Sequence, residues 1–334
     1  MTQTAAYQGR KVIVTGAGGF IGSHLVEALV AGGAKVRALL RYSSRPHRGN
    51  LEFIPDEVLK QVEVVRGDIR DPHFMLHVLE EQEIVFHLAA LIAIPYSYIA
   101  PSDYVATNVT GTLNLLEAAR RTGVQRFVQT STSEVYGTAQ FRPITEAHPL
   151  VGQSPYSASK IGADKLAESY YRSFGLPVVT VRPFNTYGPR QSARAVVPTI
   201  LAQLLSGRKQ LELGSLDPER DLTHARDTAA GMLALGACDA AIGQTVNLGT
   251  GSALTVGQIA EKCMSVTGVR LPLKVDPRRV RPEKSEVLAL ISDNGLANRL
   301  SGWKPTVSLD QGLKECADFV GSHLAHFHPE EYQR

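Results

Sequence analysis

The chain has 334 residues, of which 43% are hydrophobic and 20% charged, and its 35 Lys and Arg against 32 Asp and Glu leave a net charge of +3. This composition excludes a disordered chain, and the length predicts two domains. The balanced charge argues against nucleic acid or a membrane surface as a partner, because both attract proteins with a dense basic face.

Targeting and redox features favour the cytoplasm. The three cysteines, Cys238, Cys263 and Cys316, are too few and too scattered for a disulfide framework, and none has the CxxC spacing of a metal site. No segment has the pattern of a secretory signal or the length of a membrane-spanning helix. We therefore expect a cytoplasmic protein.

The first half of the chain alternates short apolar runs with segments of helical periodicity. The apolar runs predict strands over 11–15, 35–40, 62–66, 84–88, 126–130 and 178–182. Between them the periodicity predicts helices over 20–31, 71–82, 102–122 and 155–174. This order is typical of an α/β protein of the Rossmann type, in which a doubly wound parallel sheet binds its ligand at the carboxyl ends of the strands.

Beyond residue 183 the elements are shorter and mixed, with several Gly and Pro turn signals. We predict a first domain over 1–183 and a smaller α/β lobe over 184–334, with a cleft between them. The two domains are not expected to be continuous in sequence. Residues 223–250 again have the pattern of a helix followed by an apolar strand, and parts of this segment can rejoin the sheet of the first domain.

The junction between the first strand and the first helix carries three glycines in the spacing Gly16-x-x-Gly19-x-x-Gly22. Glycines there permit a tight turn, close approach of the backbone to a pyrophosphate and close packing of helix on sheet, while the helix N-terminus attracts the negative charge. With Phe20 and Ile21 between them, they predict a dinucleotide site rather than a merely structural turn.

The end of the second strand bears on the choice between NAD and NADP. An acid normally stands there in NAD sites, because it binds the ribose hydroxyls of the adenosine. Here the strand ends in Arg41, followed by Ser43 and Ser44. These residues can hold a 2′-phosphate, which favours NADP; the alternative is that Arg41 and Arg45 are solvated loop charges.

A further adenosine contact is expected after the third strand, at Gly67-Asp68-Ile69. The Asp68 carboxylate suits an adenine, with Ile69 beside it. Asp71 has a separate structural role, because it is placed to cap the helix that follows.

Tyr156 and Lys160 lie four residues apart on a predicted helix, and hence on one face of it. A phenol is a poor base at neutral pH, but a neighbouring Lys⁺ and an oxidised nicotinamide favour its phenolate. Tyr156 can then take a hydroxyl proton while hydride leaves the same carbon. This spacing of Tyr and Lys becomes specific evidence for such chemistry because the polar segment 130–134, Thr-Ser-Thr-Ser-Glu, stands at the end of a strand upstream.

A family is recognisable from seven motifs in chain order: TGAGGFIG at 15–22, GDI at 67–69, HLAA at 87–90, NVTGT at 108–112, TSTSEVYG at 130–137, YSASK at 156–160 and RPFNTYGPRQ at 182–191. Together they closely resemble the extended short-chain dehydrogenase/reductase family, and within it the nucleotide-sugar epimerases and dehydratases. The resemblance covers about residues 10–320. It implies further cofactor contacts, beside Tyr156 and Lys160, at Leu88, Ala89, Ala90, Asn108 and Thr130.

The resemblance also implies the partners. They are a tightly bound NAD(P) that is reduced and reoxidised within one turnover, a nucleotide-diphosphate sugar bound by the lobe over 184–334, and a second copy of the chain. The homodimer is expected to form through the helices near 102–122 and 155–174.

Thr132, Ser133 and Glu134 decide which reaction the resemblance implies. In the family, 4-epimerases tend to have an apolar residue where Glu134 stands. A 4,6-dehydratase needs a base for the C5 proton and an acid for the departing C6 hydroxyl. We assign both roles to Glu134. Thr-Ser-Glu resembles the triplet of GDP-mannose 4,6-dehydratases, which are NADP enzymes, whereas the dTDP-glucose type has Thr-Asp-Glu. The alternative for Glu134 is an ordinary polar residue that closes a strand.

The segments 89–101, 151–164 and 188–200 look most like those of bacterial 4,6-dehydratases that act on nucleotide-linked N-acetylhexosamines. We therefore predict conversion of a UDP- or GDP-N-acetylglucosamine type of sugar to the 4-keto-6-deoxy sugar. The main rivals are a 4-epimerase and a UDP-glucuronate decarboxylase, which also carries Thr-Ser-Glu, and a 5,6-dehydration is conceivable from the same residues. A scaffold that only senses NAD(P) would have no use for this complete set of catalytic side chains.

The predicted sequence of steps uses five side chains. Thr132 and Tyr156 hold the C4 hydroxyl, and Tyr156 deprotonates it as hydride leaves. Glu134 removes the C5 proton, and water leaves C6 with the help of Glu134 itself or of a relay through Ser133 before hydride returns to C6. Lys160 orients the ribose and tunes Tyr156.

The two phosphates of the substrate need cations or fixed donors. Family positions and chemistry give the candidates Asn185, Arg190, Arg220 and Arg281, with Val197 beside the base. Arg278 and Arg279 are interpreted as solvated charges. His224 and the histidines of 323–328 are interpreted as surface or core residues, so we expect no metal.

Overall fold

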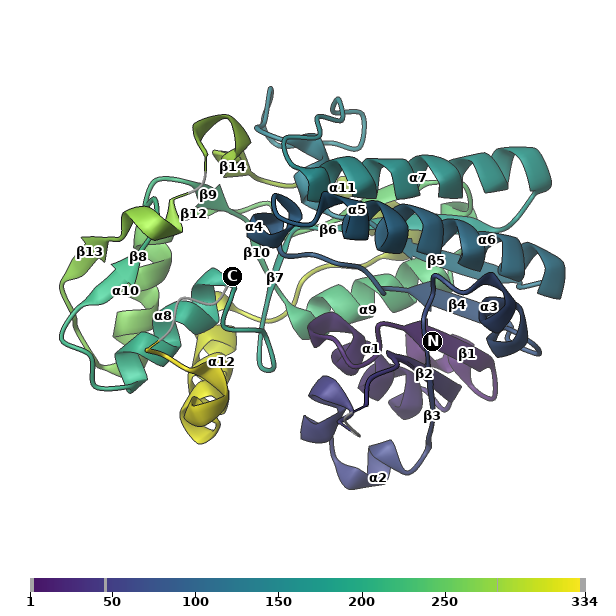
Figure 1. Cartoon of the computed structure of the whole chain (residues 1–334), viewed down its shortest axis with the longest axis horizontal. Helices are drawn as coiled ribbons and strands as arrows, with labels where there is room; N and C mark the ends of the chain where they lie inside the picture. The colour runs from purple at the N-terminus through teal and green to yellow at the C-terminus, as the bar shows by residue number, and fades with distance from the viewer. Residues whose placement is uncertain (1–2, 45–46, 281, 331–334) are drawn as a thin grey trace.

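The computed structural model describes residues 3–44, 47–280 and 282–330, which form a large α/β domain beside a smaller lobe (Figure 1). In the large domain, one seven-stranded sheet has the order β11-β6-β5-β4-β1-β2-β3, and all its neighbouring strands are parallel. The strands are β1 (Lys11–Thr15), β2 (Lys35–Arg41), β3 (Val62–Gly67), β4 (Ile84–His87), β5 (Arg126–Thr130), β6 (Val178–Pro183) and β11 (Thr245–Leu248). The predicted doubly wound sheet is confirmed.

Helices cover both faces of the sheet, because its central strands are apolar on both sides. In β1, for example, Val12 and Val14 belong to one buried cluster and Ile13 to another. Figure 1 shows α6 beside α7 on one face and α1 beside α9 on the other. The covering helices are α1 (Phe20–Ala31), α9 (Ala225–Gly236), α3 (Pro72–Val78), α6 (Gly111–Thr122) and α7 (Pro155–Phe174).

Two predicted helices differ in detail from the structure. The helix predicted over 71–82 is α3, which ends at Val78, and the chain then turns through Glu81 at a φ of +62°. Asp71 caps α3 as predicted, accepting hydrogen bonds from two amides of its first turn at 2.9 and 3.1 Å. The helix predicted over 102–122 consists of three consecutive pieces, α5 (Pro101–Tyr104), a π-helical turn (Val105–Thr110) and α6.

The smaller lobe has an apolar core of its own, in which Leu201, Leu213 and Ile259 are buried together. Its main elements are α8 (Val196–Leu205), β8 (Leu211–Leu213), α10 (Val256–Thr267), β13 (Leu273–Val275) and α12 (Leu309–Ser322). Shorter pieces complete the fold: α2 (Asp56–Leu59), α4 (Ile94–Ser97), α11 (Gly295–Ser301), β7 (Asn185–Tyr187), β9 (Glu219–Arg220), β10 (Leu222–His224), β12 (Leu254–Thr255) and β14 (Ala289–Leu290).

The chain returns to the large domain after its first passage through the smaller lobe. Helix α9 packs on α1, and β11 pairs with β6 at the edge of the sheet. We therefore propose a division at 1–183 and 184–334 in which α9 and β11, both within 223–250, are added to the large domain. Over the described ranges, none of the helices is long and apolar enough to cross a bilayer.

Candidate active site

A cavity of about 780 Å³ opens at the carboxyl ends of the parallel strands and extends into the smaller lobe. The predicted cofactor residues in its walls are Gly16, Gly19, Phe20, Ile21, Gly22, Arg41, Leu88, Ala89, Ala90 and Thr130. The predicted catalytic and substrate residues in its walls are Thr132, Ser133, Glu134, Tyr156, Lys160, Asn185, Val197 and Arg220. The fold thus brings three groups of residues, far apart in the sequence, to one cavity.

The glycine-rich turn lets a ligand approach the backbone closely. Gly16 has a φ of +69°, and a Cβ there would lie 2.7 Å from the amide nitrogen of Ala89. A Cβ on Gly22 would lie 2.3 Å from the carbonyl oxygen of Gly16, so α1 can pack this close only with glycine. Helix α1 follows Gly19, and within the described ranges no side chain caps its first amides. These free amides fit the pyrophosphate of a dinucleotide.

Three basic side chains line the cavity beyond the second strand. Arg41 is exposed at the end of β2, and His47 and Arg48 lie in the loop that follows it. That loop is attached to the glycine-rich turn, because the amide of Asn50 donates to the carbonyl oxygen of Gly18 at 2.9 Å. The two guanidinium groups, with the His47 side chain beside them, fit a phosphate on the adenosine ribose. Sequence reasoning missed His47 and Arg48, although their basic character so soon after Arg41 was a usable signal.

Some predicted residues lie away from the cavity walls: Ser44, Asp68, Ile69, Asn108 and Arg190. Asp68 is held by Arg70, whose guanidinium donates to its carboxylate at 2.6 to 3.0 Å. These hydrogen bonds lower the pKa of the Asp68 carboxyl. Arg281 lies outside the described residues.

Tyr156 and Lys160 are both buried on one face of α7. The start of this helix is fixed just before Tyr156 by a reciprocal cap, in which Ser154 accepts a hydrogen bond from the backbone amide of Ser157, whose hydroxyl in turn accepts from the Ser154 amide. The cap therefore sets where the phenol enters the cavity.

Burial opposes the charged state of both side chains. It lowers the pKa of Lys160 to about 8, and the negative charge of Asp164 opposes that shift. The Lys160 ammonium donates to the carbonyl oxygen of Thr130 at 2.6 Å. Burial raises the pKa of Tyr156, and a hydrogen bond with Thr132 offsets part of the rise. A phenolate therefore needs a further positive charge beside it, which an oxidised nicotinamide supplies when bound.

Glu134 stands in a short helical turn (Ser133–Tyr136) directly after β5. Thr132 caps this turn by accepting a hydrogen bond from the Glu134 amide at 3.2 Å. The Glu134 side chain is half-buried in the cavity wall, and its charge raises the pKa of Tyr156. The Glu134 carboxylate therefore lines the same cavity as the phenol and acts on it through its charge.

Asn108 lies outside the cavity walls and holds two of the segments that form them. Its side chain accepts from the amide of Leu91 at 2.8 Å and donates to the carbonyl oxygen of the same residue at 2.9 Å. It also donates to the hydroxyl of Ser159 at 2.9 Å. Asn108 thus holds the wall formed by the segment after β4 against α7.

The smaller lobe contributes polar groups at the other end of the cavity. The Oδ1 atom of Asn185 is buried and, within the described part of the chain, has no hydrogen-bond partner, as expected of an atom that accepts a hydrogen bond from a ligand. The Arg220 guanidinium donates to the carbonyl oxygen of Val287 at 2.8 Å and pairs with Glu286 at 3.0 Å. Val197 is buried in the first turn of α8. This end fits the diphosphate and base of a sugar nucleotide.

Arg279 is a correction to the sequence interpretation, which took it as a solvated charge. Its side chain is only 11% exposed and lines the cavity, whereas that of the neighbouring Arg278 is 68% exposed. The Asp276 carboxylate pairs with both, at 3.4 Å and 2.9 Å respectively. Because the Asp276 amide donates to the carbonyl oxygen of Leu213 at 2.7 Å, the turn that carries Arg279 lies against β8.

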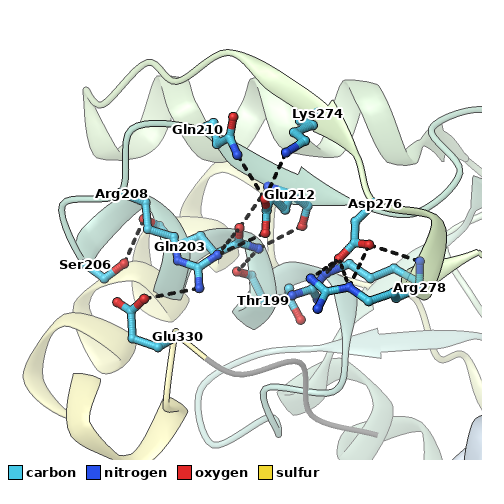
Figure 2. A network of polar contacts seen from close by, with 11 residues as sticks. Thr199, Gln203, Ser206, Arg208, Gln210, Glu212, Lys274, Asp276, Arg278 and Glu330 are labelled. Atoms are coloured by element: carbon cyan, nitrogen blue, oxygen red, sulfur yellow. Dashed lines mark hydrogen bonds and ion pairs between the residues drawn. The ribbon is translucent and has the colours of Figure 1, made fainter.

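Helix α8 and strand β8 are held together by Gln203 and Glu212, at the centre of the network in Figure 2. The Gln203 side chain donates to the Glu212 carbonyl oxygen at 3.0 Å and accepts from the Glu212 amide at 2.9 Å. The end of β8, with the following Gly214 and Ser215, is thereby fixed as a wall of the cavity.

Arg190 points away from the cavity, toward α1. Its backbone has a φ of +71°, and its guanidinium donates to His24 at 2.6 Å and pairs with Glu27. In this position it joins the loop after β7 to the large domain.

His224 is buried and caps α9, because its Nδ1 accepts from the amide of Arg226 at 3.3 Å. No cluster of three or more metal-ligating side chains occurs among the residues that the structure describes.

Comparisons with known proteins agree with this geometry. The family model described as GDP-mannose 4,6 dehydratase matches residues 13–316. A dTDP-glucose 4,6-dehydratase of Actinoplanes sp. is 33% identical over 318 residues, which cover 91% of this chain and 96% of that protein. The crystal structure of a dTDP-glucose 4,6-dehydratase from Streptomyces venezuelae with NAD bound has a TM-score of 0.86 at 31% identity, covering 96% of this chain and 99% of the other. An epimerase from Methanothermobacter thermautotrophicus has a TM-score of 0.89 at 30% identity, covering 97% and 96%.

Proposed function

Since this chain belongs to the GDP-mannose 4,6-dehydratase family of nucleotide-sugar-modifying short-chain dehydrogenases, we propose that it is an NAD(P)-dependent 4,6-dehydratase. Its substrate is a UDP- or GDP-linked sugar of the N-acetylglucosamine type, and its product is the 4-keto-6-deoxy sugar. The observation that carries the proposal is the Glu134 carboxylate in the cavity wall, close enough to Tyr156 for its charge to act on that phenol. A 4-epimerase needs no base for a C5 proton.

The residues of the chain move the protons of this reaction, and the nicotinamide supplies hydride transfer in both directions when bound. Tyr156, aided by Thr132, removes the proton of the C4 hydroxyl. Glu134 then takes the C5 proton, which the new C4 ketone has made acidic, and delivers a proton to the departing C6 hydroxyl, directly or through Ser133. Lys160 orients the ribose and contributes positive charge.

The cofactor is held by the glycine-rich turn and the uncapped start of α1. We propose NADP rather than NAD, because Arg41 and Arg48 bring positive charge to the ribose end of the cavity, with His47 beside them. The mass of the cofactor released from the purified protein tests this preference.

The sugar nucleotide is proposed to lie between the two lobes. The guanidinium groups of Arg220 and Arg279 and the side-chain NH2 of Asn185 line that part of the cavity and suit two phosphates, and Val197 suits the face of a base. Arg281 stays a candidate from the sequence alone.

We also propose a homodimer. The helical stretch 101–122 and helix α7 pack side by side and expose large apolar side chains, with Val105, Leu113 and Phe174 exposed by 54%, 38% and 56%. Such residues on adjacent helices favour association with a second copy. Light scattering of the wild type and of Leu113→Arg tests this, since the variant should be monomeric.

A 4-epimerase is the second candidate, because the similar structures include an epimerase with a TM-score of 0.89. One experiment separates it from the dehydratase. The purified protein is incubated with UDP- and GDP-linked GlcNAc, glucose, mannose and glucuronate, and the products are followed by mass. Loss of one water supports the proposal, whereas an isomer of unchanged mass or loss of carbon dioxide refutes it.

A further inference from the structure

Next to the cavity, a buried polar cluster joins α7 to the segment 131–136, which we term the catalytic loop because it carries Thr132 and Glu134; only Ser131 of this cluster lines the cavity itself. Its members are each at most 5% exposed: Ser131, Tyr136, Asp164, Arg182 and Asn247. Neither Asp164 nor Arg182 lines the cavity. Polar side chains this deeply buried are costly unless paired, so their arrangement calls for a specific role.

Asp164 fastens the beginning of the catalytic loop. It lies four residues after Lys160 and eight after Tyr156, so the three side chains share one face of α7. Its Oδ2 atom accepts a hydrogen bond from the hydroxyl of Ser131 at 2.6 Å and one from Arg182 at 3.0 Å. The first residue of the loop is therefore tied to the helix that carries the phenol and the ammonium.

Arg182, on β6, fastens the end of the same loop. Its Nη1 atom donates to the phenol oxygen of Tyr136 at 3.0 Å, and its guanidinium carbon lies 5.0 Å from the centre of that ring. The Tyr136 hydroxyl in turn donates to the Oδ1 atom of Asn247 on β11 at 2.7 Å. One ion pair, Asp164 with Arg182, thus holds both ends of the catalytic loop.

We propose that Asp164 and Arg182 are positioning residues of the reaction, which fix Glu134 in the catalytic loop relative to Tyr156 and Lys160 on α7. Asp164 has a second task, because its negative charge stabilises the buried ammonium of Lys160. The inference rests on the proposed function, in which Glu134 and Tyr156 act on one sugar.

The surroundings of Lys160 make Asp164 its counter-charge. The titratable and charged groups on the elements around it include His87 on β4, Glu134 in the catalytic loop, Tyr156 and Asp164 on α7, and Arg182 on β6, and of these His87 and Asp164 interact with its charge. His87 is neutral, since burial lowers its pKa to about 3. The charge of Asp164 opposes the lowering of the Lys160 pKa by burial. Removing that charge should make Lys160 lose its proton at a lower pH.

Asp164→Asn tests the inference, because it keeps the shape and an acceptor for Ser131 but removes the charge. We expect kcat to fall about 10- to 100-fold, as for a displacement of ~1 Å, with the alkaline limb of the pH profile moved down by about 1 unit. Asp164→Glu restores the charge and should restore the limb. Asp239→Asn is the control, since Asp239 pairs with Arg126 at 2.6 Å at the opposite end of β5 and should change neither quantity.

Loss of one partner of a buried ion pair can unfold a protein, so Tyr136→Phe provides a second test. It deletes only the hydroxyl that joins Arg182 to the loop. We expect faster amide hydrogen exchange over 131–136 and a kcat about 10-fold lower, with the alkaline limb unmoved.

The two readouts keep this inference separate from the proposed function. Amide exchange needs no substrate, so a chain that turns over no nucleotide sugar would refute the proposed function and leave the exchange test intact. Wild-type exchange over 131–136 in Tyr136→Phe would overturn the inference. A folded Asp164→Asn with wild-type kcat and an unmoved alkaline limb would overturn it as well.

Discussion

Gly22→Ala should damage cofactor binding more than folding. A Cβ at this position would lie 2.3 Å from the carbonyl oxygen of Gly16 and 3.0 Å from the Cα of Ala17. Both are backbone atoms, which cannot rotate away. Ordinary van der Waals contact begins at 3.4 Å, so α1 and the glycine-rich turn must separate by the difference of 1.1 Å.

The size of the effect follows from that displacement. Forcing extra volume into a close contact costs about 1–3 kcal/mol of folding free energy, and a misplacement of ~1 Å in a binding site costs up to about 100-fold. We expect the Kd for NAD(P) to rise about 10- to 100-fold, measured by titration calorimetry, and the variant to stay folded, checked by thermal unfolding.

Gly257→Ala is the matched control. Gly257 also lies in the first turn of a helix, α10, but there the nearest atom to a new Cβ is 3.7 Å away. This substitution should leave the Kd unchanged and stabilise the helix by up to about 1 kcal/mol. Wild-type cofactor affinity in Gly22→Ala would show that this close contact does not position the glycine-rich turn.

Three further outcomes are expected. Glu134→Gln should keep its cofactor affinity but form product at least about 100-fold more slowly, and an undiminished rate in a product-mass assay would remove Glu134 as the base. Replacing Arg41 and Arg48 by Ala should weaken NADP relative to NAD by at least about 100-fold, because two charge-assisted hydrogen bonds are lost and each contributes roughly 1.5–3 kcal/mol; equal losses for both cofactors would rule out a phosphate contact. Raising the pH through about 8 should lower kcat, because Lys160, with a pKa of about 8, loses its charge above that value; a rate that stays constant well beyond it would show that the charge is not required.

Local patterns predicted much of the fold and the cavity. The alternation of apolar runs and periodic segments located the six predicted strands, and the glycine spacing located the turn before α1. The pairing of Tyr156 with Lys160 on one helical face and the cap at Asp71 were also predictable. Each of these features depends on residues that lie within about two helical turns of one another in the sequence. A short stretch of sequence is therefore enough to predict it.

Side chains whose direction depends on distant partners were not predictable in this way. Arg279 lines the cavity because β13 pairs with β8, about sixty positions earlier in the chain, and Asp276 then holds the turn that follows. Arg190 forms an ion pair with Glu27 on α1, which lies 163 residues earlier in the chain. The cluster around Asp164 joins three elements, α7, β6 and β11, and a loop, so no single window of sequence reveals it.

The most direct test of the central claim is the reaction in deuterated water, with the mass of the sugar product measured. Removal of the C5 proton by Glu134 and its later replacement from solvent predict a product that has lost one water and gained one deuterium at C5. An isomer of unchanged mass without deuterium would contradict the account, because it would mean that C4 is oxidised and reduced with no chemistry at C5.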